Sequence, residues 1–91
     1  MVGVSTPEEA TSLGRVLVVE DERTLAGMVA AYLSRAGFRT DVVHTGTEAV
    51  VAVRESHPDV VILDLGLPGL DGIEVCRQIR TFSNCYVIIT S

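Results

Sequence analysis

Four oxygen-bearing side chains stand where apolar runs of the sequence end. Glu20 and Asp21 follow the run "RVLVV", Asp64 follows "VVIL", and Thr90 ends the run "YVIIT". An isolated carboxylate is strongly disfavoured in an apolar interior. We therefore expect these side chains to lie at an opening of the fold, where they can find partners.

The residue types at these positions suggest metal-assisted phosphoryl chemistry. Carboxylates that crowd together repel one another, and a hard divalent cation relieves the repulsion. Magnesium typically takes one or two carboxylates together with water and phosphate oxygens. We predict a Mg²⁺ site from Glu20, Asp21 and Asp64, with Gly66 letting the backbone approach the metal or the anion. Asp64 could then act as a carboxylate nucleophile, and the hydroxyl of Thr90 suits a phosphoryl oxygen.

The elements that would position these residues alternate in hydrophobic period. Continuous or alternating β-branched runs predict strands, and apolar residues at helical spacing predict helices. The predicted strands are 15–19, 38–43, 59–63 and 86–90, and the predicted helices are 22–36, 45–56 and 71–80. The first helix would place Leu25, Met28, Val29, Tyr32 and Leu33 at helical spacing on one face. The third would bury Val75, Cys76 and Ile79.

Local signals mark where these helices begin and end. Gly37 is a stop for the first helix, and Thr45 or Thr47 is the N-cap of the second. The dipeptide His57-Pro58 ends the second helix. Asp71 is the predicted N-cap of the third helix, and we weigh this above a role as a ligand.

Strands that alternate with helices predict an α/β fold with a doubly wound parallel sheet. In such a sheet, ligands bind outside the carboxyl ends of the strands. If the first and third strands are neighbours, the three carboxylates share one edge. The second strand contains Arg39, Thr40 and Asp41, so we place it at an edge of the sheet. The pattern stops after a fourth strand with no helix to cover the next face, so we expect residues 15–91 to be a partial domain.

Composition limits the classes of function. The chain has 91 residues, 47% of them hydrophobic, and a net charge of −5, which is typical of one small globular domain. All seven basic residues are arginines and they are scattered, so the segment lacks the basic stripe that nucleic acid requires. No apolar run approaches the roughly 20 residues of a membrane span. Residues 1–14 predict a disordered leader without signal-peptide features, and we expect a cytoplasmic protein.

The two cysteines, Cys76 and Cys85, have neither CxxC nor zinc-site spacing. We interpret them as reduced thiols that pack in the interior, with a redox switch as the weaker alternative. His44 and His57 fall in or before loops. A phosphoryl-carrier role for either is a minor alternative, because neither has an evident carboxylate partner.

Taken in order and spacing, "VLVVEDE", "VVILDLGLPGLDGIEVCRQIR" and "VIITS" closely resemble the receiver domain of bacterial two-component response regulators. The resemblance covers residues from about Arg15 to Ser91 and implies a flavodoxin-like receiver fold. The segments "VEDE" and "LPGLDGIEVCRQIR" are most similar to the branch of the family whose receivers precede a winged-helix DNA-binding domain.

The resemblance implies a role for each residue of the acidic edge. Asp64 would be the phosphoacceptor for a sensor histidine kinase, Asp21 would bind magnesium directly, and Glu20 would bind it through water. The carbonyl of Gly66 would complete the protein ligands. Thr90 would contact a phosphoryl oxygen and switch inward. Pro68 and Gly69 would shape the neighbouring loop.

The sequence also departs from the family. Complete receivers have a fifth strand with a lysine that pairs with the phosphoryl group, an aromatic switch residue, and two further helices that form the dimer face in the winged-helix branch. None of these lies within the 91 residues, which contain no lysine. We therefore expect magnesium binding to survive and phosphorylation to be severely impaired.

Three alternatives stay open at this point. An aspartyl-nucleophile phosphatase would want a second Asp at the position of Gly66. A flavodoxin-like binding module would want a phosphate loop in place of Glu20 and Asp21. The chain could also be a receiver piece with an exposed edge and no activity of its own.

Overall fold

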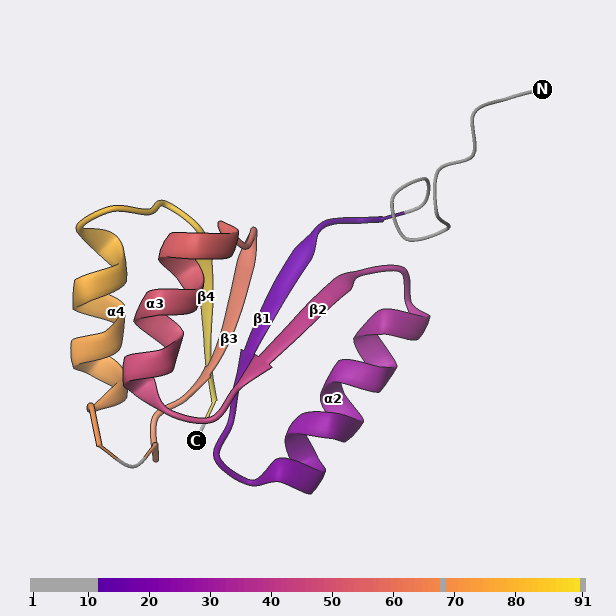
Figure 1. Cartoon of the computed structure of the whole chain (residues 1–91), viewed down its shortest axis with the longest axis horizontal. Coiled ribbons are helices and arrows are strands. Elements are labelled where there is room, and N and C mark those ends of the chain that lie inside the picture. The colour runs from indigo at the N-terminus through magenta and orange to yellow at the C-terminus, as the bar shows by residue number, and fades with distance from the viewer. Residues whose placement is uncertain (1–11, 68, 91) are drawn as a thin grey trace.

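The computed structural model describes residues 12–67 and 69–90 of the chain, and Figure 1 shows how its elements are arranged. The elements are β1 (Arg15–Val19), α2 (Arg23–Arg35), β2 (Arg39–Val43), α3 (Gly46–Ser56), β3 (Val60–Asp64), α4 (Gly72–Arg80) and β4 (Tyr86–Thr90). Every predicted strand and helix is present, with its ends within one residue of the predicted ends. Within the described ranges, no helix combines the length and the apolar character needed to cross a bilayer.

The four strands form one parallel sheet in the order β2-β1-β3-β4. This confirms that β2 is an edge strand and that β1 and β3 are neighbours. β1 is buried on both faces, since the side chains of Val16 to Val19 are at most 4% exposed. Continuous β-branched runs are typical of such a central parallel strand. The carboxyl ends of β1 and β3 therefore lie together at one edge of the sheet.

The main core lies between the sheet and the helices α3 and α4, which share one face of it in Figure 1. Alternate strand residues point to this side and meet the inward face of each helix. The fully buried members are Leu17, Val19, Ala49, Val53, Val61, Leu63, Val75 and Ile79. Cys85 belongs to the same core and Cys76 packs against it, as predicted. Burial raises the pKa of the Cys76 thiol.

Of the described helices, only α2 covers the opposite face of the sheet, where it packs on β1 and β2. The apolar residues predicted to share one face of this helix are only partly covered. Leu25, Met28 and Tyr32 are 44%, 65% and 71% exposed, and Ala26 is the one residue of the helix that is fully buried. The reason is that no described helix lies over β3 and β4 on this side. Tyr86, at the start of β4, is likewise 77% exposed.

Side chains fix the helix ends. Glu22 is the N-cap of α2 and accepts hydrogen bonds from the backbone N–H groups of Thr24 and Leu25. Thr45, rather than Thr47, is the N-cap of α3. Asp71 caps α4 through the N–H of Ile73, at 2.9 Å, as predicted.

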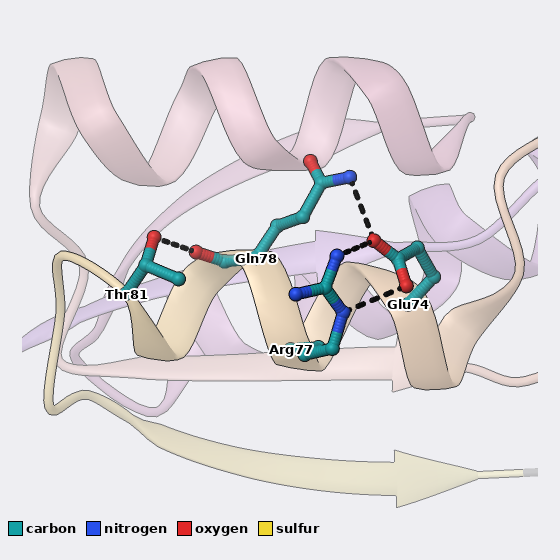
Figure 2. Close-up of polar contacts among 4 residues, drawn as sticks. All are labelled: Glu74, Arg77, Gln78 and Thr81. Atoms are coloured by element: carbon teal, nitrogen blue, oxygen red, sulfur yellow. Dashed lines mark hydrogen bonds and ion pairs between the residues drawn. The ribbon is translucent and has the colours of Figure 1, made fainter.

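The C-terminal ends are equally defined. α3 ends at His57, which adopts a left-handed conformation with φ of 49° just before Pro58. In α4, Arg77 and Gln78 both donate hydrogen bonds to the carboxylate of Glu74 (Figure 2). The bond from Arg77, followed by that from Gln78, lowers the pKa of Glu74 to about 2. Thr81 closes the helix by donating its hydroxyl to the carbonyl of Gln78.

Candidate functional site

Three carboxylates meet at the carboxyl edge of the sheet. Glu20 and Asp21 follow β1, and Asp64 ends the neighbouring strand β3. One carboxylate oxygen from each residue lies within 4.8 Å of the others. The predicted convergence is therefore confirmed, and it follows directly from the adjacency of β1 and β3.

Negative charge is concentrated at this edge of the sheet. The backbone N–H of Glu22 donates to Oε2 of Glu20 at 3.1 Å, and this bond lowers the pKa of Glu20. Desolvation and the negative charges of Asp64 and Asp21 outweigh it, so the pKa of Glu20 is raised. Three oxygen donors that repel one another are the ligand chemistry that hard cations such as Mg²⁺ prefer. The donor set therefore fits a divalent cation.

Asp64 is half-buried at the end of β3, and the backbone N–H of Gly66 donates to its Oδ1 at 2.9 Å. This short loop bond orients the carboxylate and leaves other lone pairs for a ligand. A Cβ added at Gly66 would lie 3.5 Å from Oδ1, an ordinary contact distance. The contacts at this position therefore leave room for a residue larger than glycine. That the carbonyl of Gly66 is a metal ligand stays a prediction.

Thr90 is the register partner of Asp64 on β4. Its hydroxyl donates to the carbonyl of Leu63 at 3.4 Å, a long and weak bond that a stronger acceptor could replace. Thr90 and Glu20 both line a cavity of about 180 Å³ between the sheet and α2. The structure thus places the hydroxyl at the same edge as the carboxylates.

The loop after Asp64 is anchored at both ends. Leu67 is buried against the core, and Asp71 caps α4. Gly69 has φ of +80°, a conformation that other residues adopt only with strain. Pro68, which the sequence also assigns to this loop, lies outside the described residues.

His44 is the residue of this edge that sequence reasoning missed. It follows β2, and its ring Nδ1 lies 2.9 Å from the backbone carbonyl oxygen of Glu20. The two residues are 24 positions apart, and no spacing pattern links them. Glu22, the first residue of the predicted helix, is the N-cap of α2. Its position at the start of the helix is the sequence feature that could have predicted this capping role.

Comparison with known sequences gives consistent results. Residues 16–91 match the family model described as the response regulator receiver domain. The chain is 48% identical over 75 residues to the DNA-binding response regulator MtrA of Mycobacterium tuberculosis, covering 82% of this chain and 33% of that protein. It is 38% identical over 77 residues to the transcriptional regulatory protein BaeR of Escherichia coli, covering 85% of this chain and 32% of that protein. The chain thus spans about a third of the length of these relatives.

Solved structures agree with the sequences. The N-terminal domain of a response regulator receiver protein from Methanoculleus marisnigri superposes with a TM-score of 0.83 at 29% identity, covering 88% of this chain and 68% of that one. The BeF3-activated receiver domain of RstA from Klebsiella pneumoniae gives 0.78 at 31%, covering 82% and 64%. Fold, acidic edge and sequence agree, and the chain belongs to the response regulator receiver domain family.

Proposed function

We propose that Asp64 is the phosphoacceptor of a two-component signalling pathway. A sensor histidine kinase would present a phosphohistidine, and a carboxylate oxygen of Asp64 would attack its phosphorus. The P–N bond breaks, its electron pair stays on the kinase imidazole, and an aspartyl phosphate forms on this chain. The observation that supports this most is the meeting of three carboxylates within 4.8 Å at the end of β3.

Glu20, Asp21, Asp64 and the carbonyl of Gly66 are the groups we assign to Mg²⁺. The ion supplies positive charge that neutralises carboxylate and phosphoryl oxygens. The raised pKa of Glu20 supports this assignment, because it reports the repulsion that a cation would remove. Within this arrangement, Asp64 presents the nucleophilic oxygen and the N–H of Gly66 keeps its carboxylate oriented.

Thr90 is the residue we assign to sensing the phosphoryl group. Its bond to Leu63 is weak, and a phosphoryl oxygen is a stronger acceptor. The added negative charge would draw the hydroxyl toward Asp64 and change the surface of β4. The output would be a changed interaction surface, with no metabolic product. The chain would at most assist its own phosphorylation and dephosphorylation.

The partners follow from the relatives. MtrA is named a DNA-binding response regulator and BaeR a transcriptional regulatory protein. We infer a cytoplasmic regulator that controls transcription through a DNA-binding domain outside this sequence, as a homodimer in the complete protein. The 91 residues contain no lysine to pair with the phosphoryl group. Labelling of this chain alone is therefore expected to be far below stoichiometric.

The test is an amide NMR titration of residues 1–91 with Mg²⁺. We expect dispersed peaks and magnesium-dependent shifts at Glu20, Asp21, Asp64 and Gly66. Asp64→Asn should weaken binding, because it removes one of the three negative charges. A spectrum that is dispersed but insensitive to magnesium would refute the metal site.

A second experiment tests the phosphoacceptor itself. Incubation with acetyl phosphate and Mg²⁺ should give a low yield of a hydroxylamine-sensitive acyl phosphate, detected by intact mass. The adduct should disappear in Asp64→Asn. An adduct that persists in this variant would place the phosphoryl group elsewhere, and a stoichiometric yield on the wild type would refute the expected impairment.

A further inference from the structure

We infer that His44 is a positioning residue for the acidic edge, acting through the backbone carbonyl of Glu20. The inference rests on the proposed magnesium site and adds a residue that lies outside its ligand set. The observation is the distance of 2.9 Å between Nδ1 of His44 and the carbonyl oxygen of Glu20. A carbonyl oxygen only accepts, so Nδ1 bears the proton and donates it.

This bond completes a two-point attachment of Glu20 to the end of β2. The backbone N–H of Glu20 donates to the carbonyl of Val43 at 3.1 Å, continuing the ladder between β1 and β2. The next residue, His44, then reaches across with its ring to the carbonyl of the same glutamate. Both backbone polar groups of Glu20 are thus bonded to two consecutive residues of a neighbouring segment.

The attachment sets the direction in which the acidic residues leave the sheet. The carbonyl of Glu20 belongs to the peptide plane that also contains the nitrogen of Asp21. A fixed carbonyl therefore fixes the starting direction of Asp21, which is exposed in the turn before α2. The side chain of Glu20 is separately oriented by the N–H of Glu22.

His44 is itself anchored from the other side. Its backbone N–H donates to Oε1 of Glu48 at 3.2 Å, in the first turn of α3. The hydroxyl of Thr45 donates to Oε1 of Glu48 and accepts from the backbone N–H of Glu48, which completes the same capping turn. The backbone of His44 is thus held by α3 while its ring bonds to the turn after β1, so this residue adds a side-chain link between the two segments.

The physical need for such a bond is the repulsion among the carboxylates. Three negative groups within 4.8 Å push the turn after β1 away from Asp64. A hydrogen-bond donor that holds the backbone carbonyl of Glu20 opposes this motion. Removing it would let the turn relax, so the metal would have to reorder its ligands when it binds.

The test compares two substitutions that differ in one hydrogen bond. His44→Leu removes the donor and keeps an apolar side chain, whereas His44→Asn places an amide N–H three bonds from Cα, the position of Nδ1. The measurement is Mg²⁺ affinity from amide NMR titration. We expect the dissociation constant to rise roughly tenfold in His44→Leu, as for other residues that orient metal ligands. We expect His44→Asn to recover most of the loss.

A spectroscopic measurement on the wild type does not depend on any variant. In mildly alkaline buffer, a long-range ¹H–¹⁵N spectrum should show His44 as the Nδ1–H tautomer. An Nε2–H tautomer would overturn the inference, because Nδ1 would then be an acceptor facing another acceptor. His57, at the end of α3 and away from the acidic edge, is the matched control, and His57→Asn should leave magnesium affinity unchanged.

The outcomes separate this inference from the proposed function. A wild-type chain that binds no magnesium overturns the metal site and the role of His44 together. Normal magnesium binding with an unchanged constant in His44→Leu overturns the role of His44 alone. Equal weakening in His44→Leu and His44→Asn, with both variants folded, would assign the effect to packing of the ring and overturn the hydrogen-bond mechanism.

Discussion

Asp64 and Thr90 face each other as register partners at the ends of β3 and β4. The backbone N–H of Leu65 donates to the carbonyl of Thr90 at 3.0 Å, so the pairing continues to the last residue of each strand. The carboxylate that we propose as the phosphoacceptor and a hydroxyl donor are therefore held on adjacent strands by the sheet itself. No loop has to move to bring them to the same edge.

Thr90→Val should separate metal binding from phosphoryl sensing. Valine has nearly the same shape and suits a strand, so thermal stability should hardly change. Magnesium affinity should also be unchanged, because the hydroxyl is not among the carboxylate donors, whereas Asp64→Asn should weaken it about tenfold or more. Amide NMR titrations of both variants provide the comparison. Equal weakening in the two variants would contradict the separate roles.

The raised pKa of Glu20 makes stability without metal depend on pH. A glutamate whose pKa is raised in the folded state favours folding while it is protonated. That contribution is fully present below the ordinary pKa of 4.5 and is lost as pH rises through the raised value. In EDTA, Glu20→Gln should therefore gain thermal stability relative to the wild type as pH rises above 4.5.

Two variables, magnesium and pH, test this effect of Glu20 on stability. Added magnesium should reduce the advantage of Glu20→Gln, because the ion compensates the same repulsion. Thermal midpoints measured at several pH values, with and without Mg²⁺, report both effects. A difference between the two proteins that stays constant with pH would show that Glu20 does not experience its acidic neighbours.

α4 contains a matched pair of isoleucines for testing the core. Ile79 is fully buried and Ile73 is 69% exposed. Ile79→Ala should cost about 2–5 kcal/mol of unfolding free energy, since it opens a cavity in the core between the sheet and α3. Ile73→Ala should change it by less than about 0.5 kcal/mol. Urea unfolding measures both. If Ile79→Ala is too unstable to fold, Ile79→Val, expected to cost about 0.5–1.5 kcal/mol, keeps the comparison measurable.

Two helical glycines should respond to alanine with opposite signs. A Cβ at Gly46 would lie 2.7 Å from both the carbonyl oxygen of Leu70 and Cγ2 of Val75. Gly46→Ala should therefore destabilise by about 1–3 kcal/mol, because the α3–α4 contact must move apart. Gly27 in α2 has open space, so Gly27→Ala should stabilise by about 0.5–1 kcal/mol. Thermal midpoints that move in the same direction would contradict this account of the contact.

The sequence by itself determined the elements and the location of the site. Apolar runs and helical spacing are local properties of the chain, and they predicted each strand and helix to within one residue. The acidic edge was also predictable, because parallel strands bring their carboxyl ends to one edge and Glu20, Asp21 and Asp64 each stand at such an end. Asp71 was predictable as a cap for the same local reason.

Only the tertiary structure decided which apolar residues are covered and which distant groups touch. Helical spacing predicted an apolar face on α2 but could not tell that Leu25 and Met28 stay largely exposed, since burial depends on what packs against the helix. The contact between His44 and Glu20 arises because β2 pairs with β1 and ends beside it. Strand order and register bring these two residues together, and both depend on the packing of the whole sheet.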